Sequence, residues 1–475
     1  MSTKAAQAAR SDGARIERVT PGDLMYVGLE NRDWPLHFGG LAVVDGGPLL
    51  EADGALDLPG LEVLLERRLD RVPRLRQRIH DPGPLRGRPI WADDPHFSID
   101  EHVNVLEVPA PGGEDELLHA ATRLHERPLN PRRPRWELWL LTGLASGRVG
   151  ILLKLHHSIA DGLGAVAVMT SLFDLEPNAG DPTPTPWTPA PVPSSGALLA
   201  DSVAQASRRA RKALVVLTRP RDLAGQVGSL GRTTRGFFGT MAAPGSSINR
   251  RVRAGRRVGV LRLDVDDVRQ VARARGGRVN DVVLTLWAAG LRGLLQARGE
   301  ATEGVELVAS VPVSLRSADE SAVVANRVGV MIVPLPVGGA DPWARLDAVV
   351  AATGQAKARQ QPAAIMGFMA RLASTPFGRR YTERQRAINV QVTNVPGPTE
   401  PVHLLGARVL EILPFISLAG NVGLTLCAFS YCGRLSLVVT ADRTAFPDLD
   451  ELTAAMHTEW DALAAAQEGR RPQPS

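Results

Sequence analysis

Two adjacent histidines, His156 and His157, are the residues whose type and spacing best fit catalysis. They open the segment HHSIADG (156–162), which follows a predicted strand and precedes a predicted helix. Because neighbouring side chains of a strand point to opposite faces, one imidazole can face a cleft while the other packs inside the protein. A histidine has an ordinary pKa of about 6.5, so it can accept a proton at neutral pH. One of the two is therefore a candidate general base.

Two other interpretations of the segment stay open. A metal site would need at least one ligand beyond the two histidines and Asp161, and the segment supplies none. In a purely structural role the histidines would pack in the core, Asp161 would cap the next helix, and Gly162 would allow close backbone approach. Covalent catalysis is not favoured, because there is no GxSxG turn and neither Cys427 nor Cys432 has a histidine nearby in the sequence.

Strand and helix patterns alternate along both halves of the chain, which predicts an α/β fold with two lobes of similar size. Strands are predicted at 37–45, 97–108, 136–141, 149–155, 258–263, 305–313, 328–336, 388–393, 409–413, 421–430 and 435–441. Helices are predicted at 58–72, 114–127, 162–175, 264–275, 342–360, 363–372 and 448–465, and one that ends at 295 is capped by Asn280 or Asp281.

A segment rich in Pro and Thr, at 181–195, is the clearest domain boundary. It predicts an N-terminal lobe at 15–178 and a C-terminal lobe at 244–466, with a disordered tail at 1–14 and a C-terminal tail at 467–475. Between the lobes, residues 179–243 combine this linker with a crossover segment. Residues 196–241 carry arginines beside an apolar side, which predicts a cationic amphipathic helix. That helix is either solvated or rests on anionic lipid headgroups.

Composition excludes several classes of protein. The chain has 475 residues, 44% of them hydrophobic, and a net charge of +5 that is mild for this length. With an aromatic content of 4%, this charge does not indicate a nucleic-acid-binding protein. No apolar run reaches the ~18 residues of a membrane helix, and the first residues lack an apolar signal core, so we expect a cytoplasmic protein. Cys427 and Cys432 are five residues apart, on opposite faces if they share a strand, so we expect no disulfide.

The HHSIADG segment resembles the bacterial wax ester synthase/diacylglycerol acyltransferase family. That family is part of the wider HHxxxDG group of CoA-dependent acyltransferases and peptide-synthetase condensation domains. Further segments between about residue 18 and residue 463 are similar: VTPGD (19–23), PLHFGGL (35–41), WADDPHF (91–97), PLNPRRPRWE (128–137), VNDVVL (279–284), SVPVSLR (310–316), NRVG (326–329), VPLP (333–336) and NVPGP (394–398). Arg135 departs from the family, which usually has leucine there, and this charge is expected to alter the acceptor or acyl pocket.

The resemblance implies two lobes like that of chloramphenicol acetyltransferase, with a tunnel between them. It also implies transfer of a fatty acyl group from acyl-CoA to diacylglycerol, or to a long-chain alcohol to give a wax ester, without a metal or other cofactor. His157 matches the second histidine of the motif and would be the base. His156, Asp161 and Gly162 would support it, with Asp161 paired to an arginine.

Four more residues lie in matching second-lobe segments and are candidates for the substrate site: Asn280, Asp281, Asn394 and Gly397. Asn280 and Asn394 are polar positions that could donate to a reaction oxyanion, or could equally be helix-cap and turn residues. The expected partners are acyl-CoA, diacylglycerol or an alcohol, and a lipid surface at the inner membrane face or on lipid droplets, but no nucleic acid. The alternatives are acyl transfer to a polyketide or peptide intermediate, and a non-catalytic acyl-CoA-binding paralogue.

Overall fold

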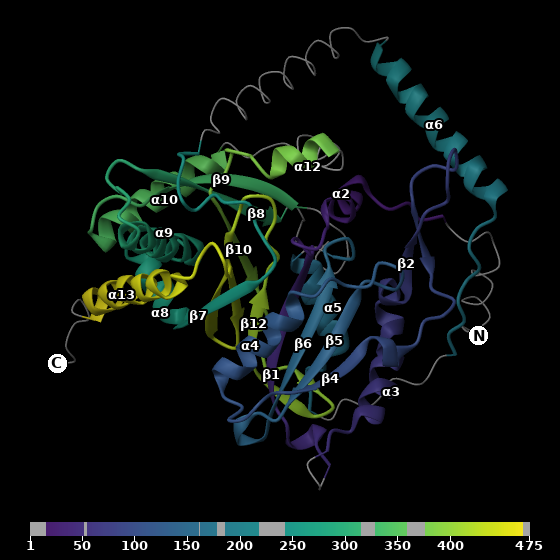
Figure 1. Cartoon of the computed structure of the whole chain (residues 1–475), viewed down its shortest axis with the longest axis horizontal. Helices are drawn as coiled ribbons and strands as arrows, with labels where there is room; N and C mark the ends of the chain where they lie inside the picture. Colours follow the sequence, from purple (N-terminus) through teal and green to yellow (C-terminus); the bar gives the residue numbers. More distant parts are fainter. Residues whose placement is uncertain are drawn as a thin grey trace.

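Two mixed sheets with helices on their faces form the part of the chain that the computed structural model describes, residues 16–51, 55–160, 162–177, 186–217, 243–314, 328–358 and 376–468. Each sheet has six strands, and a small two-stranded sheet lies beside the first (Figure 1). The predicted α/β class with two lobes is therefore confirmed. The predicted helix at 363–372 lies outside the described residues.

The first sheet has the strand order β11-β12-β1-β6-β5-β4. Its strands are β1 (His37–Asp45), β4 (Val103–Glu107), β5 (Trp136–Thr142), β6 (Arg148–His156), β11 (His403–Leu404) and β12 (Ala407–Phe415). After its first residue β6 is buried throughout, as expected for an apolar strand covered on both faces. Strands β11 and β12 come from the second half of the sequence, so residues 244–466 contribute to both sheets.

Helices cover both faces of the first sheet. Helices α3 (Leu58–Arg68) and α5 (Gly162–Leu172) share one core cluster with it. Helix α4 (Glu114–His125) packs on the opposite face, where Leu41 and Val43 of β1 point. Buried residues recur along α4 at the spacing of one helical face, which explains why this segment forms an amphipathic helix.

The second sheet has the order β7-β14-β13-β10-β8-β9. Its strands are β7 (Arg256–Asp264), β8 (Glu306–Ser314), β9 (Val328–Pro336), β10 (Val390–Pro396), β13 (Leu424–Tyr431) and β14 (Arg434–Asp442). Figure 1 shows its helices gathered on one side: α8 (Val265–Arg273), α9 (Val279–Ala297), α10 (Pro342–Ala358) and α13 (Leu449–Glu468). The largest core cluster of the described residues lies between these helices and the sheet.

Two local predictions differ from the structure. The strand predicted at 97–108 begins only at Val103, because Ile99–Glu101 forms a 3-10 turn in which Ser98 hydrogen-bonds Asp100. The small sheet of β2 (Gln77–His80) and β3 (Ile90–Asp93) was not predicted, since its strands are only four residues long and lack a clear apolar alternation.

Helix α6 (Ser195–Leu217) extends away from both lobes (Figure 1). Its first turns are held against the first lobe, where Leu198 is buried with Ile90 and Asp201 pairs with Arg18 at 2.8 Å. From Ala206 to Arg211 every residue is exposed. The predicted helix in the crossover segment is therefore present over 195–217, and residues 218–242 lie outside the described part.

Helix α2 (Pro21–Leu29) lies against the end of β6 that carries the histidines. Thr20 caps it by accepting a hydrogen bond from the Asp23 backbone N–H, and Pro21 occupies its first turn, as the sequence TPGD predicts. Directly after the helix, Glu30 pairs with Arg135 at 3.0 Å and accepts a hydrogen bond from the Leu36 N–H. Their side chains are only 14% and 10% exposed, so this ion pair fixes the helix from inside the protein.

Replacing Glu30 by alanine tests this anchor. Glu30→Ala leaves the Arg135 charge buried and unpaired, which should lower the free energy of unfolding by about 3–5 kcal/mol. The double variant Glu30→Ala/Arg135→Leu removes that charge and should recover most of the loss. Denaturant unfolding of both variants and of Arg135→Leu measures the coupling. A double variant no more stable than Glu30→Ala would contradict an ion-pair anchor.

Candidate active site

His157 lies directly after β6, at the edge of a cavity between the two sheets. Its backbone N–H donates to the Leu36 carbonyl at 3.1 Å. Its ring is stacked on Tyr26 of α2, with centroids 4.7 Å apart and an interplanar angle of 18°. Phe38 of β1 contacts it edge-on at 4.9 Å. The imidazole is thus held between two aromatic rings and borders the cavity.

The cavity has a volume of about 180 Å³ and is lined by both lobes. Strands β1 and β6 and helix α5 form one wall, and strands β8, β10 and β13 form the other, with β12 between them. Most of the lining side chains are aliphatic or aromatic, among them Met169, Phe173 and Phe429. Such a lining fits an acyl chain.

Burial in this cavity, together with the nearby His156, lowers the pKa of His157 to about 3. Burial disfavours the charged imidazolium, so the resting ring is neutral at neutral pH. A neutral imidazole carries a nitrogen lone pair that can accept a proton. The ring is therefore in the protonation state that a general base requires.

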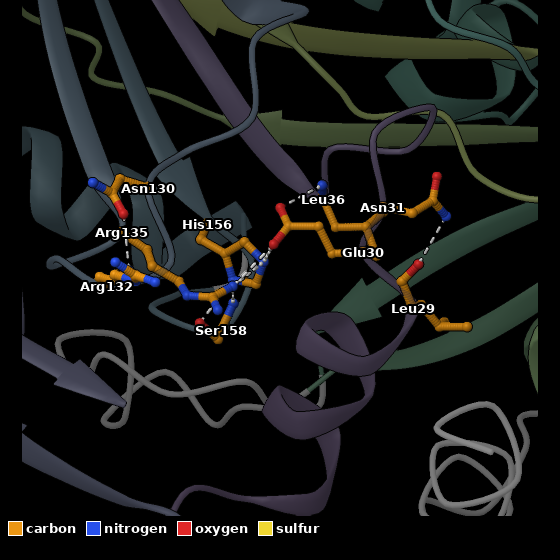
Figure 2. Close-up of polar contacts among 9 residues, drawn as sticks. All are labelled: Leu29, Glu30, Asn31, Leu36, Asn130, Arg132, Arg135, His156 and Ser158. Carbon is orange, nitrogen blue, oxygen red and sulfur yellow. Dashed lines mark hydrogen bonds and ion pairs between the residues drawn. The ribbon is translucent and has the colours of Figure 1, made fainter. Parts of the chain in front are cut away.

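His156 points the other way and is fully buried. Its Nδ1 accepts a hydrogen bond from the Ser158 backbone N–H at 3.0 Å, and the Ser158 hydroxyl lies 2.7 Å from the same atom. Its Nε2 lies 3.5 Å from Glu30 and 3.4 Å from Arg135, as Figure 2 shows. Because Nδ1 accepts, the proton of the neutral ring sits on Nε2 and faces the Glu30 carboxylate. His156 does not border the cavity, so its contacts fix the loop that carries His157.

The charges around His156 favour ionised Glu30. Burial raises the pKa of Glu30, but the hydrogen bond from His156, the charge of Arg135 and the hydrogen bond from the Leu36 N–H outweigh this, so that its pKa lies below the ordinary value. Burial also lowers the pKa of His156. Arg135 is not among the residues that line the cavity, so any effect of this charge on the acceptor or acyl pocket would be indirect. Its guanidinium is turned toward Glu30 because that carboxylate is its buried partner.

Of the last two residues of the HHSIADG segment, the structure describes the backbone of Gly162 but not Asp161. Gly162 is the first residue of α5, so the predicted start of this helix is confirmed. Asp161, predicted as its cap and as the partner of an arginine, lies outside the described residues.

The four candidates of the second lobe do not line the cavity. Helix α9 begins at Val279 after the cap residue Arg278, so neither Asn280 nor Asp281 is its N-cap. Asp281 is buried, where it accepts hydrogen bonds from the Arg278 N–H and the Thr353 hydroxyl, each at 2.7 Å. It therefore ties α9 to α10, and the half-buried Asn280 lies beside it.

Asn394 and Gly397 lie on and after β10. Gln391, Thr393 and Val395 of this strand line the cavity, so Asn394, at the alternate position, belongs to the other face. A Cβ on Gly397 would lie 2.4 Å from the Phe429 ring and from the Ser430 carbonyl. Glycine is required there so that the end of β10 can approach β13.

Besides the apolar lining, four polar residues of the cavity were missed in the sequence: Tyr26, Gln391, Thr393 and Cys427. A sequence signal was present for Gln391 and Thr393, because these polar residues alternate with Val390 and Val392 along β10. No such signal marks Tyr26, since its contact with His157 joins segments that are far apart in the chain. Cys427 is a buried free cysteine and Cys432 a free cysteine in the turn after β13. Among the described residues no group of three or more His, Cys, Asp or Glu side chains could hold a metal ion.

Solved structures share this fold. A wax ester synthase/diacylglycerol acyltransferase from Marinobacter aquaeolei VT8 matches with a TM-score of 0.67 and 23% identity, covering 95% of this chain and all of that one. The starter condensation domain of rhizomide synthetase, solved with C8-CoA, matches with a TM-score of 0.59 and 15% identity, covering 98% of this chain and 97% of that one. The two-lobed fold that the sequence resemblance implied is therefore confirmed.

Sequence comparisons identify the family. A probable diacylglycerol O-acyltransferase of Mycobacterium tuberculosis is 30% identical over 449 residues, which cover 93% of this chain and 94% of that protein. A putative diacylglycerol O-acyltransferase of Mycobacterium bovis gives the same values. The wax ester synthase/diacylglycerol acyltransferase catalytic domain matches residues 19–283, and the C-terminal domain of the same family matches residues 324–464. The chain therefore belongs to the wax ester synthase/diacylglycerol acyltransferase family.

Proposed function

We propose that this protein transfers a fatty acyl group from acyl-CoA to the hydroxyl of diacylglycerol, and less readily to a long-chain alcohol, with His157 as the general base. The observation that carries the proposal is the neutral His157 ring at the edge of an apolar cavity lined by both lobes. The mycobacterial relatives named as diacylglycerol O-acyltransferases support this choice of acceptor.

The reaction begins when the imidazole of His157 takes the hydroxyl proton while the oxygen bonds to the thioester carbonyl carbon. The carbonyl electrons move onto its oxygen, and the negative charge that develops beside the ring raises its pKa and so stabilises the imidazolium. The tetrahedral intermediate then collapses, the C–S bond breaks, and the CoA thiolate takes the proton from the imidazolium. An ester and free CoA are formed, and the step needs acyl-CoA as substrate and no cofactor.

His157→Ala should lower kcat by about 10²–10⁴-fold, the usual contribution of a positioned base. The measurement is the release of CoA thiol from acyl-CoA with diacylglycerol, with circular dichroism as a check on folding. His119→Ala removes an exposed histidine outside the cavity and should leave kcat unchanged. Undiminished turnover in folded His157→Ala would exclude the base role. Turnover only with carrier-bound or peptide acceptors, or binding without thiol release, would instead favour the alternative functions.

The pH profile should lack an acid limb near pH 6.5. Because the pKa of His157 is about 3, kcat/KM for acyl-CoA should stay nearly level from pH 8 down to about pH 5. A fall centred near pH 6.5 would show an imidazole with an ordinary pKa and contradict the buried neutral base.

The thermal stability of the protein should also change between pH 8 and pH 5, so the rates must be measured on folded protein. Burial also lowers the pKa of His37, His125 and His156, so the unfolded chain binds more protons than the folded one below pH 6.5. The Tm should therefore fall as the pH drops from 7 toward 5, and initial rates measured well below the Tm separate the two effects.

Helix α6 is the candidate contact with a lipid surface. Leu199, Val203 and Leu214 are large exposed apolar residues at positions that share one helical face. Arg208, Arg209 and Arg211 are exposed on the remaining, polar surface of the helix. An exposed helix with one apolar face and cationic residues on the rest of its surface can rest on anionic headgroups, where each Arg contributes roughly 1 kcal/mol. No described helix is long and apolar enough to span a bilayer.

Changing Arg208, Arg209 and Arg211 to glutamine should lower the fraction of protein that sediments with phosphatidylglycerol vesicles by about tenfold or more at low salt. The matched control changes three exposed arginines on other elements, Arg132, Arg269 and Arg273, and should sediment like the wild type. Equal sedimentation of the two triple variants would exclude α6 as the specific contact.

A further inference from the structure

Two polar side chains of the second lobe face the cavity that His157 borders. Gln391 and Thr393 both lie on β10 and are half-buried, whereas Val390 and Val392, which alternate with them, are fully buried in the core on the other face. No described residue hydrogen-bonds the side chain of either. This differs from the polar residues beside His156, each of which is hydrogen-bonded.

The position of β10 explains why these two side chains have no protein partner. Strand β10 pairs with β13 from Gln391 to Pro396, but with β8 only at Val390 and Gln391. Beyond that point β8 and β10 diverge, and Pro312 of β8 lines the cavity together with the two polar residues. Residues two apart on a strand lie roughly 6.6 Å apart on one face, so the hydroxyl and the longer carboxamide side chain can converge on a single group.

Both side chains are half-buried and have no hydrogen-bond partner among the described residues, so their donors are available to a ligand in the cavity. The reaction needs such donors, because the thioester carbonyl oxygen becomes an anion. The thiol of Cys427 is the other polar group that the second lobe places in the cavity. It is a weak donor, and burial raises its pKa to about 12.

We propose that the Thr393 hydroxyl and the Gln391 carboxamide bind the acyl carbonyl oxygen and stabilise the negative charge that develops on it. This assignment rests on the proposed acyl transfer. It places the base on the first lobe and the oxyanion donors on the second, so that the reacting carbon lies between them. Neither residue takes up or releases a proton; each donates one hydrogen bond, which strengthens as the C=O electrons move onto oxygen and weakens when the C–S bond breaks.

Thr393→Val tests the assignment, since it removes the hydroxyl and nearly keeps the shape of the side chain. It should lower kcat by about 10²–10³-fold, the usual effect of losing one oxyanion donor, with KM for acyl-CoA changed by less than about threefold. Thr393→Ser keeps the hydroxyl and should stay within about tenfold of the wild type. Gln391→Met removes the carboxamide at similar length and should lower kcat in the same way.

Thr425→Val is the matched control. Thr425 lies opposite Gln391 on β13 and is 1% exposed, and its hydroxyl has no hydrogen-bond partner among the described residues. It does not line the cavity, so this variant should turn over like the wild type. All variants are purified as full chains, and thiol release is measured with acyl-CoA and diacylglycerol.

The outcomes separate the two proposals. If the wild type is active and folded Thr393→Val and Gln391→Met both stay within threefold of its kcat, the oxyanion assignment is overturned while acyl transfer stands. A rise in KM at constant kcat also overturns it, since this would show uniform binding rather than stabilisation of the transition state. If the wild type releases no thiol with any acceptor, the proposed function fails and the assignment fails with it.

Discussion

The contact of helix α2 with the end of β6 is the interaction on which the site depends. Tyr26 and Glu30 are four residues apart, one turn of the chain, and each contacts a different histidine. Tyr26 stacks on His157, while Glu30 engages His156 and Arg135 behind it. This one helix and the residue after it thereby hold two adjacent imidazoles that point in opposite directions. Side-chain alternation along a strand allows this arrangement, but β6 ends at His156, so these contacts are needed to fix the direction of His157.

The second constraint is that two strands of the second half of the chain, β11 and β12, join the first sheet. Strand β12 belongs to the second half of the sequence but pairs with β1 of the first half, where Phe415 lies opposite Gly39. Its residues Ile412 and Phe415 then line the cavity between walls made by each lobe. Arg262 of β7 adds an exposed ion pair to Glu411 of β12 and another to Glu114 of α4. Since the cavity is built on this shared sheet, the lobes cannot separate without breaking strand pairing.

Sequence reasoning located the motif-bearing elements because their signals are local. The apolar run of β6, the small residues of α5 and the boundary at Gly162 all lie within one stretch of chain. The candidates Asn280, Asp281, Asn394 and Gly397 were chosen as polar or special residues in matching segments, and the structure assigns two of them a packing role. Asp281 joins two helices, and Gly397 permits a close approach of strands. Neither role can be distinguished from substrate binding without knowing which segments are neighbours.

Arg135 illustrates the same limit. The sequence shows a charge at a position that is usually apolar, but the buried partner that neutralises it, Glu30, lies 105 residues away in the chain. Local reasoning therefore placed this charge in the substrate pocket, whereas the pair lies behind His156. The order of strands in each sheet could not be predicted for the same reason, because β12 and β1 are joined by no local pattern.

The low polarity of the cavity has two effects that act together. It keeps His157 neutral, because an imidazolium would lose its hydration there. It also strengthens any hydrogen bond to an oxyanion, because such a bond is stronger in a medium of low dielectric constant. A base whose pKa is lowered by burial to about 3 can take a proton only if the negative charge formed at the same moment is held close by. The donors that we propose on β10 would therefore complement the base that we propose in His157, and each would be of little use to the reaction without the other.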